Sequence, residues 1–163
     1  MSKSLLLIAA AVATVSSCAS QNARQSSEEV KHYCAEKFAD HRIDPIREKI
    51  LIPISIDQPQ PIEILANRQR PTGDEKRALL ALAEAREACN RYADAHLGAP
   101  PAYRAASQDR VTAALSDLYA GDTTYGDFAK TLLFIGDRDK MAHEDMERAF
   151  HERERWRDLD AWN

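Results

Sequence analysis

The chain has 163 residues, with 22 lysines and arginines against 26 aspartates and glutamates and a formal net charge of −4. This length suits one domain of ordinary size. The mildly acidic balance argues against a nucleic-acid-binding protein, because such proteins present a basic face to the phosphate backbone. We therefore expect no nucleic-acid partner.

The N-terminus has the pattern of an export signal. Lys3 precedes the uncharged stretch Leu5–Val15, and a short basic start followed by an apolar run is typical of secretory signal peptides. The run is shorter than the roughly 20 residues that a membrane-spanning helix needs. We expect residues 1–17 to be removed as a signal peptide.

The next motif, Val15-Ser16-Ser17-Cys18, resembles the lipobox of bacterial lipoprotein precursors. The resemblance covers residues 1–18 and implies cleavage between Ser17 and Cys18. It also implies that Cys18 carries a covalent diacylglycerol and an N-acyl lipid, and we expect no other cofactor. Two or three acyl chains anchor a protein stably to a bilayer, whereas one does not. The alternative is an ordinary signal peptide followed by a chance cysteine.

Location and domain organisation follow from this anchor. Residues 18–26 are small and polar and predict a flexible tether, and residues 27–163 predict a single helical domain. In lipoprotein families an acidic residue directly after the cysteine favours retention in the inner membrane, and this chain has Ala19 there. The resemblance therefore implies a periplasm-facing protein of the cell envelope, with the outer membrane favoured over the inner.

Two further cysteines, Cys34 and Cys89, remain after Cys18. An exported protein reaches an oxidising compartment, where such a pair is expected to form a disulfide. The first alternative is two separate buried thiols. A zinc site is the second, and it is disfavoured because neither cysteine has a closely spaced Cys or His partner.

The apolar spacing predicts an all-α fold, a small bundle of about four helices. Ser26 and Glu29 have the spacing of a capping box and predict a first helix over 28–41. Pro45 predicts a stop and, after it, a turn or two of helix towards Leu51. From residue 52 to 71 an extended strap is expected, because four prolines deny a long helix there: Pro53, Pro59, Pro61 and Pro71.

Three further helices have clear boundary signals. Thr72 and Glu75 form a second capping box ahead of a helix over 73–96. Gly121 stands where a left-handed cap would end a helix over 102–119. Thr123 or Thr124 begins the last helix, which becomes a long charged C-terminal helix over 137–163, with Gly136 as a candidate kink. Its expected apolar side consists of Phe128, Leu132, Ile135, Met146 and Phe150.

The stretch Leu118–Ala129 resembles a turn in small uncharacterised exported helical proteins of proteobacteria. The resemblance covers only this stretch. It implies no activity.

No motif for catalysis or metal binding is found. The histidines form no His-Glu-x-x-His pattern, and His143-Glu144 with Glu147 is the nearest approach. Charged residues surround it, so we interpret it as a solvated face. No serine elbow or phosphate-binding glycine loop is present either. We assign no catalytic residue and no metal ligand.

The leading hypothesis is therefore a non-enzymatic, membrane-anchored envelope lipoprotein that binds a protein partner through its charged C-terminal helix. Trp156 and Trp162 are candidate contacts, although they could instead pack on the domain or touch lipid headgroups. The alternative function is a cell-wall-acting or hydrolytic enzyme using acidic residues, which requires two carboxylates in one cleft, one of them desolvated. A carrier of apolar ligands would instead require a sizeable cavity between helices.

Overall fold

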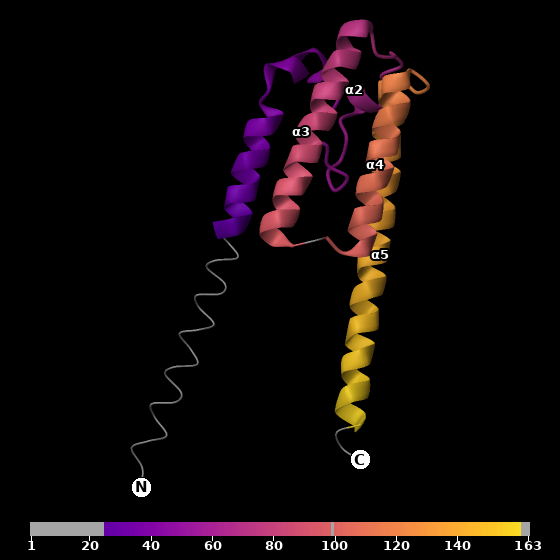
Figure 1. Ribbon diagram of the computed structural model, residues 1–163. Coiled ribbons are helices and arrows are strands. Elements are labelled where there is room, and N and C mark those ends of the chain that lie inside the picture. Colours follow the sequence, from indigo (N-terminus) through magenta and orange to yellow (C-terminus); the bar gives the residue numbers. More distant parts are fainter. Residues whose placement is uncertain (1–24, 99, 161–163) are drawn as a thin grey trace. The chain divides into compact units, whose positions relative to one another are not determined.

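The computed structural model describes residues 25–98 and 100–160, without the side chains of residues 158–160. Within these ranges the chain is all-α and contains no strand, which confirms the predicted fold class (Figure 1). None of the described helices combines the length and the apolar content needed to span a bilayer. The elements are a helix over residues 25–38, the 3-10 helix η1 (His41–Ile46), and the helices α2 (Ile62–Leu65), α3 (Gly73–Leu97), α4 (Ala102–Ala120) and α5 (Tyr125–Asp160).

The chain divides into two compact units. Among the described residues, the first unit contains residues 25–40 together with 84–98, and the second contains residues 41–83 together with 100–160. In the first unit, the helix over 25–38 is joined to the C-terminal half of α3 by the Cys34–Cys89 disulfide.

The first helix lies three residues earlier than the predicted span of 28–41. Ser26 is already helical and is not the N-cap, and the side chain of Gln25 donates to Glu29 within the first turn. The helix ends at residue 38, because η1 begins only three residues later. Pro45 lies inside η1, so the predicted helical turn starting at Pro45 was also wrong.

The early turn into η1 has a packing reason. Residues three apart lie on one side of a 3-10 helix, and Ile43 and Ile46 are both fully buried in the second unit. Ile50 follows them into the same core at 2% exposure. The burial of these isoleucines therefore outweighs the proline signal that suggested a later start.

The second unit is centred on α4 and α5, which run antiparallel. The turn between them uses Gly121 in the left-handed conformation (φ 88°), as predicted, and Thr124 Oγ1 caps α5 by accepting from the backbone N–H of Asp127 at 3.2 Å. Between the two helices the apolar core comprises Val111, Ala114, Leu115 and Leu118 from α4 and Phe128, Leu132 and Ile135 from α5.

The predicted strap lies along α5 and includes the single short helix α2. The backbone N–H of Gly126 donates to Asn67 O at 2.8 Å, and that of Tyr125 donates to Gln69 O at 3.0 Å. Further along α5, the carbonyl of Ile56 packs directly onto Gly136, where a Cβ atom would overlap it. α5 continues as a helix through Gly136, so this glycine serves close packing of the strap.

Candidate functional site

A polar pocket opens in the second unit where the strap passes the start of α4 and the middle of α5. Its volume is about 320 Å³, which is at the lower end of the size of small-molecule sites. The residues lining it are Ile56 and Asp57 from the strap, Tyr103 and Arg104 from α4, and Gly136, Asp137, Asp139, Lys140 and His143 from α5.

Asp139 forms the inner wall of the pocket. It is only 4% exposed, and its carboxylate accepts a hydrogen bond from Ser107 Oγ at 2.7 Å. Ser107 is itself 1% exposed. Arg104 Nη1 lies 3.4 Å from the other carboxylate oxygen of Asp139. A buried carboxylate is costly unless it is paired, and here α4 provides both partners, Ser107 and Arg104.

Arg104 connects this wall to the strap. The same guanidinium nitrogen, Nη1, lies 3.5 Å from Asp57 Oδ2. The two carboxylates differ in environment, because Asp57 is 65% exposed whereas Asp139 is almost completely buried. One arginine is thus shared between a fixed buried acid and a solvated acid on the strap.

A second polar group also lines the pocket. His143 Nδ1 is 3.2 Å from the hydroxyl of Tyr103, and His143 Nε2 is 3.3 Å from Glu147 Oε1. The neutral tautomer that satisfies both contacts accepts from Tyr103 at Nδ1 and donates to Glu147 from Nε2. The nearest approach to a histidine motif in the sequence is therefore a hydrogen-bonded group joining α4 and α5.

The pocket meets the geometric requirement set for an acid-using enzyme, namely two carboxylates in one cleft with one desolvated. Both carboxylates, however, are ion-paired with Arg104. The pocket therefore presents both positive and negative side chains to a ligand. Within the described ranges no three His, Cys, Asp or Glu residues are grouped so as to hold a metal ion.

The apolar-carrier hypothesis can be compared with a second depression, between α4 and α5. Its volume is about 290 Å³, and Ala113, Ala114, Phe134 and Ile135 contribute to its walls. Phe134 is 60% exposed. This depression is therefore a shallow surface groove, whereas an apolar carrier needs an enclosed cavity.

A partly buried ion pair at the start of α3 has a structural role. Lys49 Nζ lies 2.5 Å from Glu75 Oε1, and Glu75 Oε2 accepts from the backbone N–H of Thr72 at 2.8 Å, which confirms the predicted capping box. Burial alone would raise the pKa of Glu75, but the hydrogen bonds from Lys49 and Thr72 outweigh it and hold the pKa below its ordinary value.

Tyr125 adjoins this ion pair, with Lys49 Nζ 5.3 Å from the centre of its ring. The Tyr125 hydroxyl is buried and finds no hydrogen bond of good geometry among the described residues. Burial, and then the negative charge of Glu75, raise the pKa of Tyr125 well above its ordinary value.

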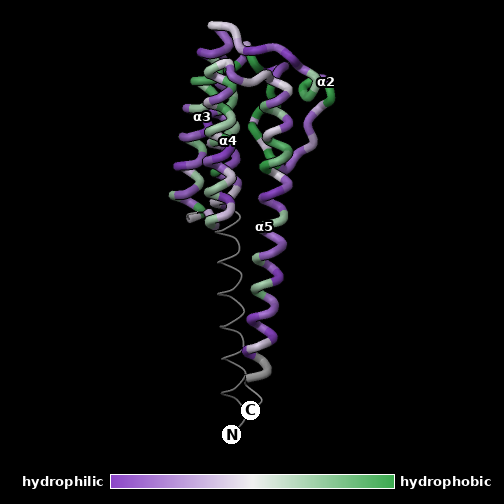
Figure 2. The backbone as a smooth tube through the Cα atoms, turned by 90° about the vertical axis from the view of Figure 1, so that its right-hand side faces the viewer, coloured by the Kyte–Doolittle hydropathy of each residue, from purple (hydrophilic) through white to green (hydrophobic). Residues whose placement is uncertain are grey.

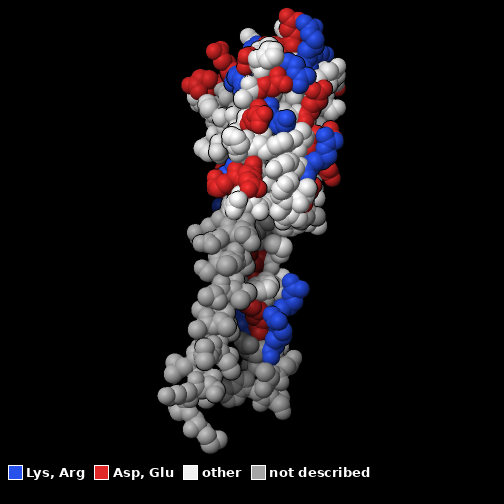
Figure 3. All heavy atoms as spheres, turned by 60° about the vertical axis from the view of Figure 1, so that its left-hand side comes forward, with Lys and Arg blue, Asp and Glu red and all other residues white. Residues whose placement is uncertain are grey.

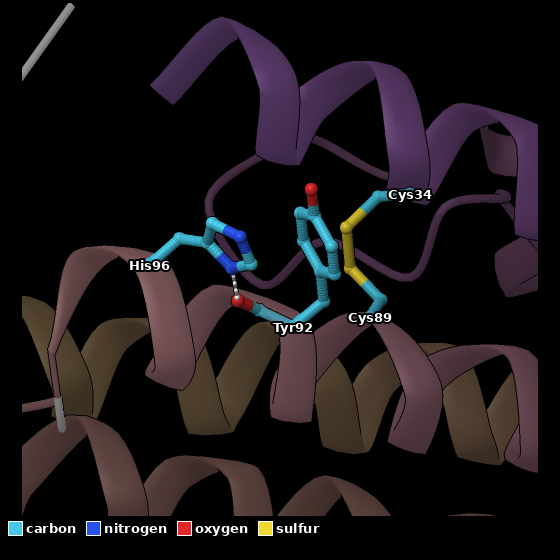
Figure 4. The surroundings of a disulfide bond; sticks show 4 residues. All are labelled: Cys34, Cys89, Tyr92 and His96. Carbon is cyan, nitrogen blue, oxygen red and sulfur yellow. Dashed lines mark hydrogen bonds between the residues drawn. A yellow bond between two sulfur atoms is a disulfide. The ribbon is translucent and has the colours of Figure 1, made fainter. Parts of the chain in front are cut away.

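The disulfide in the first unit is flanked by stacked rings (Figure 4). Tyr92 stacks on Tyr33 with ring centroids 4.0 Å apart, and His96 stacks on Tyr92 at 3.9 Å. His96 Nδ1 is also 2.8 Å from the carbonyl oxygen of Tyr92. Cys34 and Cys89, which were expected to pair, are bonded to each other beside this small aromatic cluster.

The distal segment of α5, residues 143–157, extends past the start of α4 (Figure 1). Figure 2 shows it as mainly hydrophilic with separate apolar positions, and both signs of charge appear along the part of α5 visible in Figure 3. Met146 and Phe150, which were expected on the apolar side of this helix, are 42% and 49% exposed. Both lie beyond the length of α5 that α4 covers.

The sequence-predicted site residues fall into two groups. Ser17 and Cys18, together with the proposed signal peptide, and Trp162 lie outside the described residues. Trp156 is described and is 67% exposed, so it is not packed into the described part of the chain.

Sequence reasoning missed the polar pocket, because Asp57, Arg104 and Asp139 are far apart in the chain. One signal was present: Asp139 is a charged residue four positions after Ile135, on the apolar side of its helix. Comparison with models of known families, with curated proteins and with solved structures finds no match to this chain.

Proposed function

We propose that the chain is a lipid-anchored, non-enzymatic protein of the cell envelope that binds a helical segment of a partner protein along the distal segment of α5. The observation that carries this proposal is a stripe of residues that is buried in the first half of α5 and continues, unburied, in the second. We call this stripe the seam.

The seam has the alternating three- and four-residue spacing of helices that pack side by side. Its buried part consists of Tyr125, Phe128, Leu132, Ile135 and Asp139, each at most 4% exposed. Ala142 follows at intermediate exposure. The same spacing then gives four exposed positions, Met146, Ala149, Arg153 and Trp156. The same spacing thus continues from the buried first half of α5 into its exposed second half.

The change in burial coincides with the start of α4. α4 runs antiparallel along α5, with Ser107 opposite Asp139 and Tyr103 opposite His143. Beyond His143, α4 provides no further residues to cover the seam. A partner helix placed in line with α4 would meet Met146 and Trp156 in the way that α4 meets Leu132 and Ile135. Recognition of a helix by an apolar stripe is a common mode of protein binding.

The composition of the distal segment supports contact with protein. The exposed part of the seam contains one small residue, Ala149, between the longer Met146 and Arg153, which allows a second helix to approach closely at that position. Tryptophan and arginine are also the residues most enriched at binding hot spots. Acidic and basic residues are interspersed around the seam, an arrangement that suits a mixed-charge partner better than a lipid surface.

The contact is tested by crosslinking intact envelopes and isolating this protein with its partners. We expect Met146→Ser and Trp156→Ser each to reduce recovery of the crosslinked partner by about tenfold, the effect of losing one good interfacial anchor. Met141→Ser is the matched control, because Met141 is on α5 and 57% exposed but lies off the seam. Equal partner recovery from all three variants would refute the contact surface.

The anchor is tested separately. In cells supplied with radiolabelled palmitate, the wild-type chain is expected to take up label and to fractionate with membranes, whereas Cys18→Ser is expected to do neither. If the wild-type chain remained unlabelled and among cytosolic proteins, the lipoprotein part of the proposal would fail, whatever the seam binds.

A further inference from the structure

The polar pocket contains two kinds of charged group that the proposed partner contact does not use. Arg104 and Lys140 bring positive charge to its lining, and Asp57, Asp137 and Asp139 bring negative charge. A phosphate dianion would be repelled by the carboxylates, and a simple cation by the arginine and lysine. A small molecule with one positive and one negative charge can pair with both the basic and the acidic side chains.

Arg104 has donor capacity left for such a ligand. A guanidinium has five N–H donors, and its hydrogen bonds to a carboxylate are normally 2.7–2.9 Å long. The two ion pairs of Arg104 are longer, at 3.4 Å to Asp139 and 3.5 Å to Asp57. Arg104 is thus close to both acids without making a tight, two-pronged contact with either.

A ligand carboxylate can displace only one of the two acids from Arg104. Asp139 is buried and is held by Ser107, so it stays in place. Asp57 is 65% exposed and lies on the strap, outside any helix. Exposed ion pairs are weak, and an incoming carboxylate can take the place of Asp57 on the guanidinium. Asp57 therefore occupies the position of a ligand carboxylate.

We propose that this pocket binds a small zwitterion, a free amino acid or dipeptide, through two charged contacts. The ligand carboxylate binds Arg104 in place of Asp57, and the ligand ammonium binds Asp137, which lines the same pocket. The hydrogen-bonded pair of Tyr103 and His143 also lines the pocket. This site is independent of the lipid anchor and of the contact surface on distal α5.

The test is calorimetric titration of the purified full chain with three related compounds. Alanylalanine has both charges, N-acetyl-alanylalanine lacks the ammonium, and alanylalaninamide lacks the carboxylate. We expect saturable binding of alanylalanine, and binding about tenfold weaker for each analogue, since each loses one charged contact. Equal binding of all three would overturn the charge assignment.

Variants of the two key residues make the test specific. Arg104→Gln is expected to weaken alanylalanine binding at least tenfold. Asp57→Asn removes the internal competitor and is expected to tighten binding several-fold, a gain that a merely structural role for Asp57 would not produce. Glu87→Gln, an exposed change from acid to amide in the first unit, serves as the control.

The outcomes are distinguishable even if Arg104→Gln unfolds the chain, because Asp57→Asn alters only an exposed side chain of the strap. Tighter binding by Asp57→Asn, with Glu87→Gln unchanged and circular dichroism unaltered, supports the site. The absence of saturable binding by both the wild type and Asp57→Asn, or weaker binding by Asp57→Asn, overturns it.

Discussion

Replacing both Cys34 and Cys89 by serine should release the helix over residues 25–38 while leaving α4 and α5 intact. The disulfide closes a loop of 55 residues. In the chain-entropy model, a crosslink that closes a loop of this length stabilises the folded state by about 4 kcal/mol. That figure is comparable with the total stability of many small domains.

The loss should be local because the described part of the first unit has a small apolar core. Among its described residues the buried apolar side chains are Val30, Phe38 and Ala85, supplemented by the stacking of Tyr33 on Tyr92. A short helix is marginal in water without tertiary packing. The buried residues of α4 and α5 belong to the second unit, and the disulfide does not crosslink them.

Hydrogen exchange followed by mass spectrometry measures this directly. In the double variant, amides of residues 25–38 should lose protection, whereas those of Val111–Leu118 and Phe128–Ile135 should keep it. Wild-type protein that has been reduced and alkylated should behave in the same way, which controls for the serine substitutions. Unchanged protection in residues 25–38, or an equal loss throughout α4 and α5, would refute the reasoning.

Three further predictions concern the second unit. Gly136→Ala should lower the free energy of unfolding by about 2 kcal/mol or more in denaturant titrations, because its Cβ would overlap the carbonyl of Ile56, while Gly73→Ala, with nothing near its Cβ, should be neutral or slightly stabilising. The lowered pKa of Glu75 adds stability above about pH 4.5 that is lost as the pH falls through its folded value, so Glu75→Gln should flatten the acid limb of a stability–pH curve. Tyr125→Phe should be neutral or raise the thermal midpoint, since it removes a buried hydroxyl without a good hydrogen bond.

The parts of the fold that were predictable from sequence depend on neighbouring residues. The capping box of Thr72 with Glu75, the cap at Thr124 and the left-handed Gly121 all act within one turn of a helix. Such signals are complete in a short stretch of sequence. The bounds predicted for α3 and α4 were therefore within one residue of those in the structure.

Errors occurred where tertiary packing decided the outcome. The first helix ends at residue 38 because Ile43 and Ile46 turn into the second unit, and no local signal encodes their burial. The exposure of Met146 was not predictable for a related reason, since periodicity shows that a helix has an apolar face but not how far a neighbour covers it. The pocket depends on the juxtaposition of Asp57, Arg104 and Asp139, which required the antiparallel pairing of α4 with α5.

Asp139 marks the end of the fully buried part of the seam on α5. On its N-terminal side the seam residues are aromatic or aliphatic and at most 2% exposed, so substitutions there act on stability. At Asp139 a buried charge interrupts the apolar series, and burying it requires Ser107 and Arg104, the residues that also bring the start of α4 to the pocket. Beyond it, Met146 and Trp156 keep the spacing of the seam but not its burial. Their exposed apolar area would contribute more free energy if a second helix covered it, which is the reason for placing the partner contact at these positions.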